Sequence, residues 1–218
     1  MEKIVLNGIL VDKYTSFRKV LLNIDINNVE IIKFCKSQFI IPSVQLFFKI
    51  NCKRSVNQKN IYQVLSMLDL KEIKLKDDPL MLSDSDKYKL LIALSLINNP
   101  SSFVIVYPEL YLDDCNIDLI FKIFKKLSKE YGKKIYIITN DIDLLYRECD
   151  NIYIYAKNNI IFKGNRKKIY EERETILSNN FSLPKILNFI SLVEEKKKIK
   201  LEPTFDIKEL MKDIYRNV

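Results

Sequence analysis

The side chains that most often carry out catalysis are unevenly represented in this 218-residue sequence. Histidine is absent, which excludes a Ser-His-Asp triad, a histidine metal ligand and an imidazole acid–base step. The sequence contains no CxxC pair, and its cysteines are widely spaced at Cys35, Cys52, Cys115 and Cys149. We therefore interpret them as reduced, mostly structural thiols of a cytosolic protein.

Phosphate chemistry is limited by the number of glycines. Only Gly8, Gly132 and Gly164 exist, and they lie far apart. A loop that cradles phosphate needs several clustered glycines, because its backbone must turn at positive φ and approach the phosphates with no Cβ in the way. The sequence therefore predicts that no glycine-rich phosphate loop can form.

The formal net charge of +8 is spread along the chain. Its densest run, Lys196 to Lys200, directly follows Glu194 and Glu195. We interpret this run as a solvated helix face, ahead of contact with an anionic lipid surface and of contact with nucleic acid.

The composition is that of a soluble globular protein, with 48% hydrophobic and 29% charged residues. The length fits one large domain, or one domain with a small appendage. The first apolar run is too short for a signal peptide. The longest apolar region, residues 31–50, is interrupted by three lysines and a proline, so we expect no membrane-spanning segment.

The elements that must position the polar groups begin with short, β-rich segments. Residues 3–11, 20–26 and 30–34 are predicted strands. Residues 39–50 are ambiguous between strand and helix, since Pro42 permits only a helix start or an edge strand. Apolar side chains recur at helical spacing over residues 60–70.

Downstream, strands and helices alternate. Ser83 followed by Asp86 is a capping pattern, and the helix that it starts should end near Asn98 and Asn99, before Pro100. The following elements are an apolar strand at 102–107, a helix at 114–129, a strand at 134–139, a short helix at 141–147, a strand at 151–155, and a hairpin through Asn158–Asn159 into 160–163. Wholly apolar strands separated by helices imply a parallel sheet covered on both faces.

The order of elements from Leu82 to Gly164 resembles the ATP-binding subunit of an ABC transporter. LSDSDKYKLLIALSLINNP resembles the family's leucine-serine-glycine-glycine signature and its helix, and FVIVYPELYLDD resembles its Walker B strand. IYIITND resembles the strand that ends in Thr-His-Asp, and CDNIYIYAKNNIIFKGNRKKIY resembles the closing hairpin. With its C-terminal tail, the chain is most similar to the ATPase subunits of energy-coupling-factor importers for cobalt or vitamins. The resemblance implies an α/β, P-loop NTPase-type sheet covered by helices, with a trimmed helical subdomain and a small C-terminal helical extension.

The same alignment implies that the catalytic positions are degenerate. VEIIKFCKSQFIIPS lies where the strand and phosphate loop belong, so that Pro42 replaces the phosphate-binding lysine and only Ser43 remains. Val106 and Tyr107 take the two Walker B carboxylate positions, and Asn140 takes the switch histidine position. Proline offers neither an N–H nor a charge, and valine cannot bind Mg²⁺. We therefore expect no hydrolysis of ATP by this chain alone, no catalytic residue and no metal site, with ATP and Mg²⁺ bound only if a partner supplies most of the contacts.

Three further positions match weaker parts of the family pattern, and each has an ordinary structural alternative. Tyr14 lies where the family stacks adenine, or is a common strand-end aromatic. Ser83 either donates to a γ-phosphate held by a partner or caps its helix, and Asp84 and Asp86 would repel that phosphate. Asp113 either shapes a dimer seam or is a loop carboxylate. Asp141, similarly, is expected to cap the helix that follows it.

The resemblance implies a division into an ABC ATPase-like domain at 1–165, with its helical subdomain shortened to about 52–100, and a C-terminal helical extension at 166–218 that serves in dimerisation. The leading hypothesis is a degenerate subunit that pairs with an active ABC ATPase, as a hetero- or homodimer. This pair would dock on an integral membrane transporter subunit at the inner face of the cell membrane. No nucleic-acid partner is expected. The alternatives are a soluble regulatory protein that kept the fold and a working ATPase with a divergent phosphate loop. The tail has its own alternative, which is packing on the domain to which it belongs.

Overall fold

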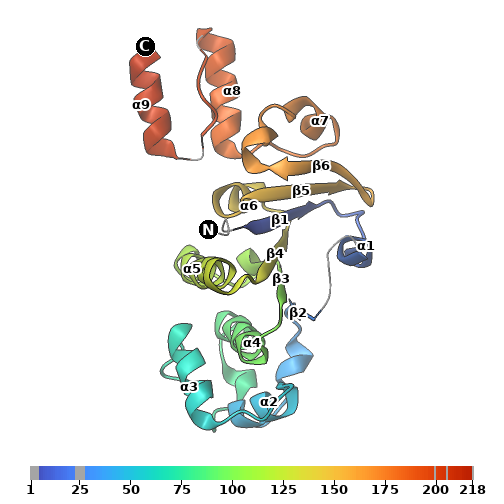
Figure 1. Ribbon diagram of the computed structural model, residues 1–218, viewed down its shortest axis with the longest axis vertical. Coiled ribbons are helices and arrows are strands. Elements are labelled where there is room, and N and C mark those ends of the chain that lie inside the picture. The colour runs from blue at the N-terminus through green and yellow to red at the C-terminus, as the bar shows by residue number, and fades with distance from the viewer. Residues whose placement is uncertain (1–4, 23–27, 199, 205, 218) are drawn as a thin grey trace. The chain divides into compact units, whose positions relative to one another are not determined.

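Residues 5–22, 28–198, 200–204 and 206–217 are described by a computed structural model (Figure 1). The chain divides into two units. The first comprises Met1–Ile4 and Asp25–Ile138, and the second comprises Val5–Ile24 and Thr139–Val218. The predicted domain boundary at residue 165 remains a prediction.

The strands of the first unit form a parallel ladder in the order β2, β3, β4, with bounds Val29–Ile32, Ser102–Val106 and Lys134–Thr139. Val29 pairs with Ser102 at one end, and Val106 pairs with Ile138 at the other. All five side chains of β3 are buried, so both faces of this strand are covered. The predicted parallel sheet is confirmed here.

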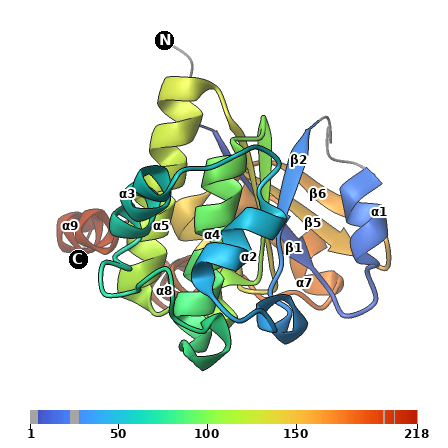
Figure 2. The same cartoon turned by 90° about the horizontal axis from the view of Figure 1, so that it is seen from below.

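Three helices of the first unit lie where the sequence predicted helices, at about 60–70, 83–99 and 114–129, whereas its three 3₁₀ turns were not predicted. The bounds of its helices and 3₁₀ turns are η1 Lys36–Phe39, α2 Val44–Asn51, α3 Gln58–Met67, η2 Pro79–Met81, α4 Asp84–Asn98, η3 Pro108–Leu110 and α5 Asp114–Tyr131. Ser83 caps α4 as predicted, and Asn99 ends it in the left-handed conformation. Figure 2 shows α3 packed beside α4. The ambiguous stretch at 39–50 is helical after Pro42.

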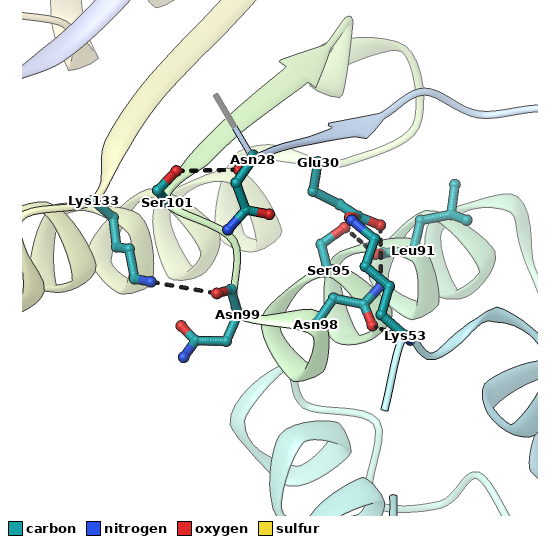
Figure 3. A network of polar contacts seen from close by, with 9 residues as sticks. All are labelled: Asn28, Glu30, Lys53, Leu91, Ser95, Asn98, Asn99, Ser101 and Lys133. Atoms are coloured by element: carbon teal, nitrogen blue, oxygen red, sulfur yellow. Dashed lines mark hydrogen bonds and ion pairs between the residues drawn. The ribbon is translucent and has the colours of Figure 1, made fainter. Parts of the chain in front are cut away.

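A network of polar side chains joins β2, the end of α2 and the end of α4 (Figure 3). The Lys53 ammonium lies 2.7 Å from a Glu30 carboxylate oxygen, and the Asn98 amide donates to the other oxygen at 3.1 Å. The backbone N–H of Lys53 donates to Asn98 at 2.9 Å. The Ser101 hydroxyl donates to the Asn28 carbonyl, which ties the start of β2 to the start of β3. These bonds hold the elements that lead into the candidate site.

The strands of the second unit are β1 Leu6–Val11, β5 Asn151–Ala156 and β6 Asn159–Asn165. Strand β1 is parallel to β5, and β5 is antiparallel to β6. The hairpin turn lies at Lys157 and Asn158, both at positive φ, one residue before its predicted place. Helix α6, Ile142–Glu148, packs on β1 at Gly8, where a Cβ would lie 2.8 Å from Leu145 and 3.0 Å from the Cys149 sulfur.

One predicted strand is wrong. Residues 20–26 were expected to be extended, but residues 20–22 belong to helix α1, Phe17–Leu22, and residues 23–27 lie outside the described residues. A short apolar run fits a strand or a buried helix segment equally well by periodicity alone. The helix begins where the Val20 N–H donates to the Ser16 carbonyl, and the Ser16 N–H donates to Asn158 of the hairpin turn. Contact with a distant turn thus supports the helix.

The C-terminal part of the second unit is helical, as predicted. Its elements are η4 Arg166–Ile169, α7 Arg173–Ser178, α8 Lys185–Lys197 and α9 Ile207–Asn217. Leu187, Ile190 and Leu210 are buried. Other large apolar side chains of α8 and α9 are exposed, namely Phe189, Leu192, Ile207, Met211 and Tyr215. Within the described residues, no helix combines the length and the apolar character that crossing a membrane requires.

Candidate functional site

The segment between β2 and α2, where the family places its phosphate loop, is packed with aromatic rings. Phe39 is fully buried and stacks on Phe47 with ring centroids 5.6 Å apart. Phe34 stacks on Tyr111, which follows η3, with centroids 4.3 Å apart. These rings fix the segment against two other parts of the first unit. Pro42 is exposed and Ser43 is partly exposed at its end.

The N–H groups of the first three residues of helix α2 already have partners. The first N–H groups of a helix lack intrahelical partners, which is why such ends bind anions. Here the Val44 N–H donates to the Asp77 carbonyl at 2.9 Å, and the Gln45 N–H donates to the Leu75 carbonyl at 2.8 Å. The Leu46 N–H donates to the Ser43 hydroxyl oxygen at 3.2 Å. The segment 75–77 therefore occupies the positions that a phosphate would otherwise take.

The end of β3 is closed in a similar way. Val106 is 2% exposed, and its carbonyl accepts a 3.0 Å hydrogen bond from the hydroxyl of Tyr88, a fully buried residue of α4. Tyr107 follows in the left-handed region at φ 50°, which is strained for a residue with a bulky side chain. Its N–H donates to the Ile138 carbonyl at 2.8 Å, which extends the β3–β4 ladder. Tyr88 in turn stacks on Tyr111.

The electrostatics of this end keep its phenols protonated. Burial raises the pKa of Tyr107, and the nearby carboxylate of Glu109 raises this pKa further. Burial also raises the pKa of Tyr88 well above its ordinary value, with smaller contributions from Glu109 and Tyr111. A phenol in this state can donate a hydrogen bond but cannot accept a proton from water. Among the residues that the structure describes, no three Cys, Asp or Glu side chains group in a way that could hold a metal ion.

The signature-like turn before α4 is a helix cap with internal ion pairs. The Ser83 hydroxyl oxygen accepts from the Asp86 N–H at 3.0 Å, and the hydroxyl donates to the Asp86 carboxylate at 2.8 Å. Asp84 lies 3.6 Å from the ammonium of Lys87, and Asp86 lies 3.2 Å from that of Lys89. Both lysine side chains are buried, at 8% and 7% exposure. The carboxylates thus have cationic partners, which reduces the repulsion expected for a nearby phosphate.

The remaining candidate residues are capping or exposed groups. Asp113 caps α5 by accepting from the Asn116 N–H at 2.8 Å, and Asp141 caps α6 by accepting from the Leu144 N–H at 3.0 Å. Asn140 is exposed directly after β4.

Tyr14 is 63% exposed, with the Lys13 ammonium 5.0 Å from its ring centroid. Tyr14 and Asn140 belong to the second unit, whereas Pro42, Ser43 and Val106 belong to the first. The same first unit holds Tyr107, Ser83 and Asp113.

Sequence reasoning missed three contributors to this site. Tyr88, Tyr111 and the carbonyls of 75–77 close the ends of β3 and α2. Tyr88 gives no signal of this role, because it lies between Lys87 and Lys89 in the sequence, and only the structure shows that its ring is buried and its hydroxyl bonded.

Comparisons with known proteins show what this chain is similar to. No model of a known protein family matches the chain. It is 33% identical over 123 residues to the energy-coupling factor transporter ATP-binding protein EcfA3 of Clostridium perfringens, covering 56% of this chain and 43% of that protein. It is 29% identical over 157 residues to an energy-coupling factor transporter ATP-binding protein of Methanocaldococcus jannaschii, covering 72% and 56%. This chain is a homologue of energy-coupling factor ATP-binding subunits. It spans about half the length of the curated relatives it matches.

Solved structures give the fold of this homologue. The structure of cbiO1 from Clostridium perfringens, part of the ABC transporter complex cbiONQ, matches it with a TM-score of 0.64 and 22% identity, over 88% of this chain and 89% of that one. A dimeric bacterial ABC transporter cassette matches with a TM-score of 0.59 and 18% identity, over 76% and 87%. The fold is that of an ABC ATPase cassette, as the sequence predicted.

Proposed function

We propose that this homologue is a non-hydrolysing ABC ATPase-like subunit that pairs with an active ATPase and docks on an energy-coupling-factor-type importer at the inner face of the membrane. The carrying observation is the closed amino end of α2. The N–H groups of Val44, Gln45 and Leu46 already donate to Asp77, Leu75 and Ser43, so these three donors are not available to the phosphates of ATP.

The end of β3, which offers neither a Mg²⁺ ligand nor a general base at Val106 and Tyr107, supports the same proposal independently. Mg²⁺ binds oxygen ligands, and the buried Val106 side chain offers none. The phenol of Tyr107 stays protonated, so it cannot take a proton from an attacking water. We infer that the chain has no Mg²⁺ or ATP site of its own, and that any ATP bound in a pair is held mainly by the partner.

The proposed role of the chain is to associate with a partner subunit through exposed parts of its surface. The signature-like cap at Ser83 is exposed, and it could meet a phosphate held on the partner. The relatives include a dimeric cassette and a member of a multi-subunit transporter complex. The exposed apolar residues of α8 and α9, such as Phe189 and Tyr215, support a role of the C-terminal segment in association, although Leu187 and Ile190 of α8 are buried within their own unit.

The first experiment measures nucleotide binding by the purified chain. Calorimetric titration with MgATP should show no binding tighter than about 1 mM, and ATPase activity should not exceed background. The same titration of an intact energy-coupling-factor ATPase is the positive control. Micromolar binding by this chain would instead favour a working ATPase with a divergent phosphate loop.

The second experiment tests pairing. Co-expression with an intact energy-coupling-factor ATPase should give a stable heterodimer. ATP hydrolysis by this heterodimer should depend on the phosphate-binding lysine of the partner alone. Truncation after Asn180 should leave the chain folded but abolish the pair. A truncated chain that melts or aggregates as a monomer would place the segment in the core and refute its role in association.

A further inference from the structure

The second unit presents an exposed face, here called the basic face, that is made of the loop at 12–16, helix α1 and the hairpin turn at 157–158. Hydrogen bonds join these pieces. The Ser16 N–H donates to the Asn158 side chain at 2.8 Å, and the Lys157 N–H donates to the Asp12 carboxylate at 3.0 Å. Both views of the fold show α1 beside the β5–β6 hairpin (Figures 1 and 2). The loop, the helix and the turn therefore form one continuous surface.

Positive charge dominates the basic face. Its exposed cations are Lys13, Arg18, Lys19 and Lys157. Within residues 12–22 and 157–158 the one carboxylate is that of Asp12, which already accepts hydrogen bonds from two backbone N–H groups and one hydroxyl. Four positive charges against one negative charge give these residues a formal charge of +3. The face is therefore expected to attract an anionic surface.

Two large apolar side chains lie among these cations. Leu22 is 68% exposed and Tyr14 is 63% exposed. Arg18 and Lys19 precede Leu22 by four and three residues, so these three side chains share one face of α1. The fully buried Val20 packs the helix against its own unit. Exposed apolar groups beside cations are typical of segments that lie on a membrane surface.

We propose that the basic face binds the surface of a bilayer that contains anionic lipids. Its ammonium and guanidinium groups contact the phosphates of the head groups, because long cationic side chains extend a charged end from an apolar stem. Tyr14 and Leu22 enter the boundary between head groups and acyl chains, where tyrosine is enriched and an apolar side chain leaves water. A nucleic acid would attract the same cations but would offer Leu22 no apolar phase to enter. The inference rests neither on pairing nor on the closed end of α2.

The test measures co-sedimentation of the full chain with vesicles, without nucleotide or partner, so its result is independent of the proposed function. Vesicles that mix phosphatidylcholine with phosphatidylglycerol should bind the chain about 100-fold more tightly than vesicles of phosphatidylcholine alone. The triple variant Lys13→Gln/Arg18→Gln/Lys157→Gln should lose about 100-fold in affinity for the anionic vesicles, because each cation near an anionic surface contributes about fivefold.

Two further variants separate the basic face from the charge of the whole chain. Lys122→Gln/Lys126→Gln/Lys129→Gln is the matched control, since it removes the same charge from the exposed side of α5, and it should weaken binding far less. Leu22→Gln leaves every charge in place and removes the apolar contact, so it should weaken binding about fivefold.

Several results would overturn the proposal. One is the lack of co-sedimentation with anionic vesicles at about 1 mM lipid, where even a single acyl anchor binds. Equal losses in the two triple variants would show that the net charge of the chain attracts the vesicles. Unchanged binding in Leu22→Gln would show that no side chain leaves water. Tighter binding of a short single-stranded RNA, lost in the first triple variant, would make the face a nucleic-acid site. Circular dichroism of each variant establishes that the fold is retained, which is expected because the altered side chains are exposed.

Discussion

The hydrogen bond from Tyr88 to the end of β3 gives the sharpest test of how the site is closed. In Tyr88→Phe the buried ring and its stacking on Tyr111, with centroids 5.2 Å apart, are retained. Only the hydroxyl is removed, together with its 3.0 Å hydrogen bond to the Val106 carbonyl. Losing such a bond and leaving a buried carbonyl with one partner fewer should lower the free energy of unfolding by about 2 kcal/mol.

Thermal and urea unfolding measure this change. For a chain of this size, about 2 kcal/mol corresponds to a fall in Tm of about 4 to 8 °C. Tyr62→Phe is the matched control, because the same atom is removed from an exposed ring on α3, and its effect should stay within about 0.5 kcal/mol. Equal stability of the two variants would refute the closing role of Tyr88.

The same substitution changes how stability depends on pH. Burial raises the pKa of Tyr88 well above 10.0, while the phenol of the unfolded chain titrates near that value. Above pH 10, the unfolded chain has therefore lost a proton that the folded chain keeps, so this group's contribution to stability falls as pH rises. The slope approaches about 1.4 kcal/mol per pH unit for one proton. Between pH 10 and 11.5, urea unfolding should show a shallower decline for Tyr88→Phe than for the unmodified chain; parallel declines would contradict the assigned shift.

Three further changes test the supporting contacts. Gly8→Ala should lower the free energy of unfolding, measured with urea, by about 1 to 3 kcal/mol, because the new Cβ would lie 2.8 Å from Leu145. Gly164→Ala, whose Cβ would have its nearest contact at 3.3 Å, should lower it less. Equal losses in the two variants would contradict this packing. Ser83→Ala should lower the free energy of unfolding by about 1 kcal/mol through loss of the α4 cap, and retention of that cost in Ser83→Gly would show that the cap is not the cause. Glu30→Gln should lower the free energy of unfolding by about 1 to 2 kcal/mol, because the ion pair with Lys53 is lost. It should also speed alkylation of Cys52, followed by mass spectrometry, because burial and the Glu30 carboxylate both raise the pKa of this thiol. Glu72→Gln is the exposed control.

Local rules predicted the parts of the fold that depend on neighbours in sequence. The caps at Ser83, Asp141 and Gly132 follow from the preferences of hydroxyl, carboxylate and glycine residues at helix ends. The apolar runs of β3 and β4 follow from burial on both faces.

The failures and omissions come from contacts between distant residues. Helix α1 forms in an apolar run that was expected to be extended, next to a hairpin turn more than 130 residues away. The sequence indicated that Pro42 removes a donor, but it could not indicate that Leu75 and Asp77 would take up the donors that remain. Nothing local marks a carbonyl as the partner of a helix end in another segment.

The closed end of α2 has a consequence for evolution. Replacing Pro42 with lysine would add one charge but would leave the N–H groups of Val44 and Gln45 bonded to the 75–77 segment. Freeing these N–H groups would require that segment to move away and the rings around Phe39 to repack. A single substitution at Pro42 is therefore not expected to create a phosphate-binding loop at this helix end.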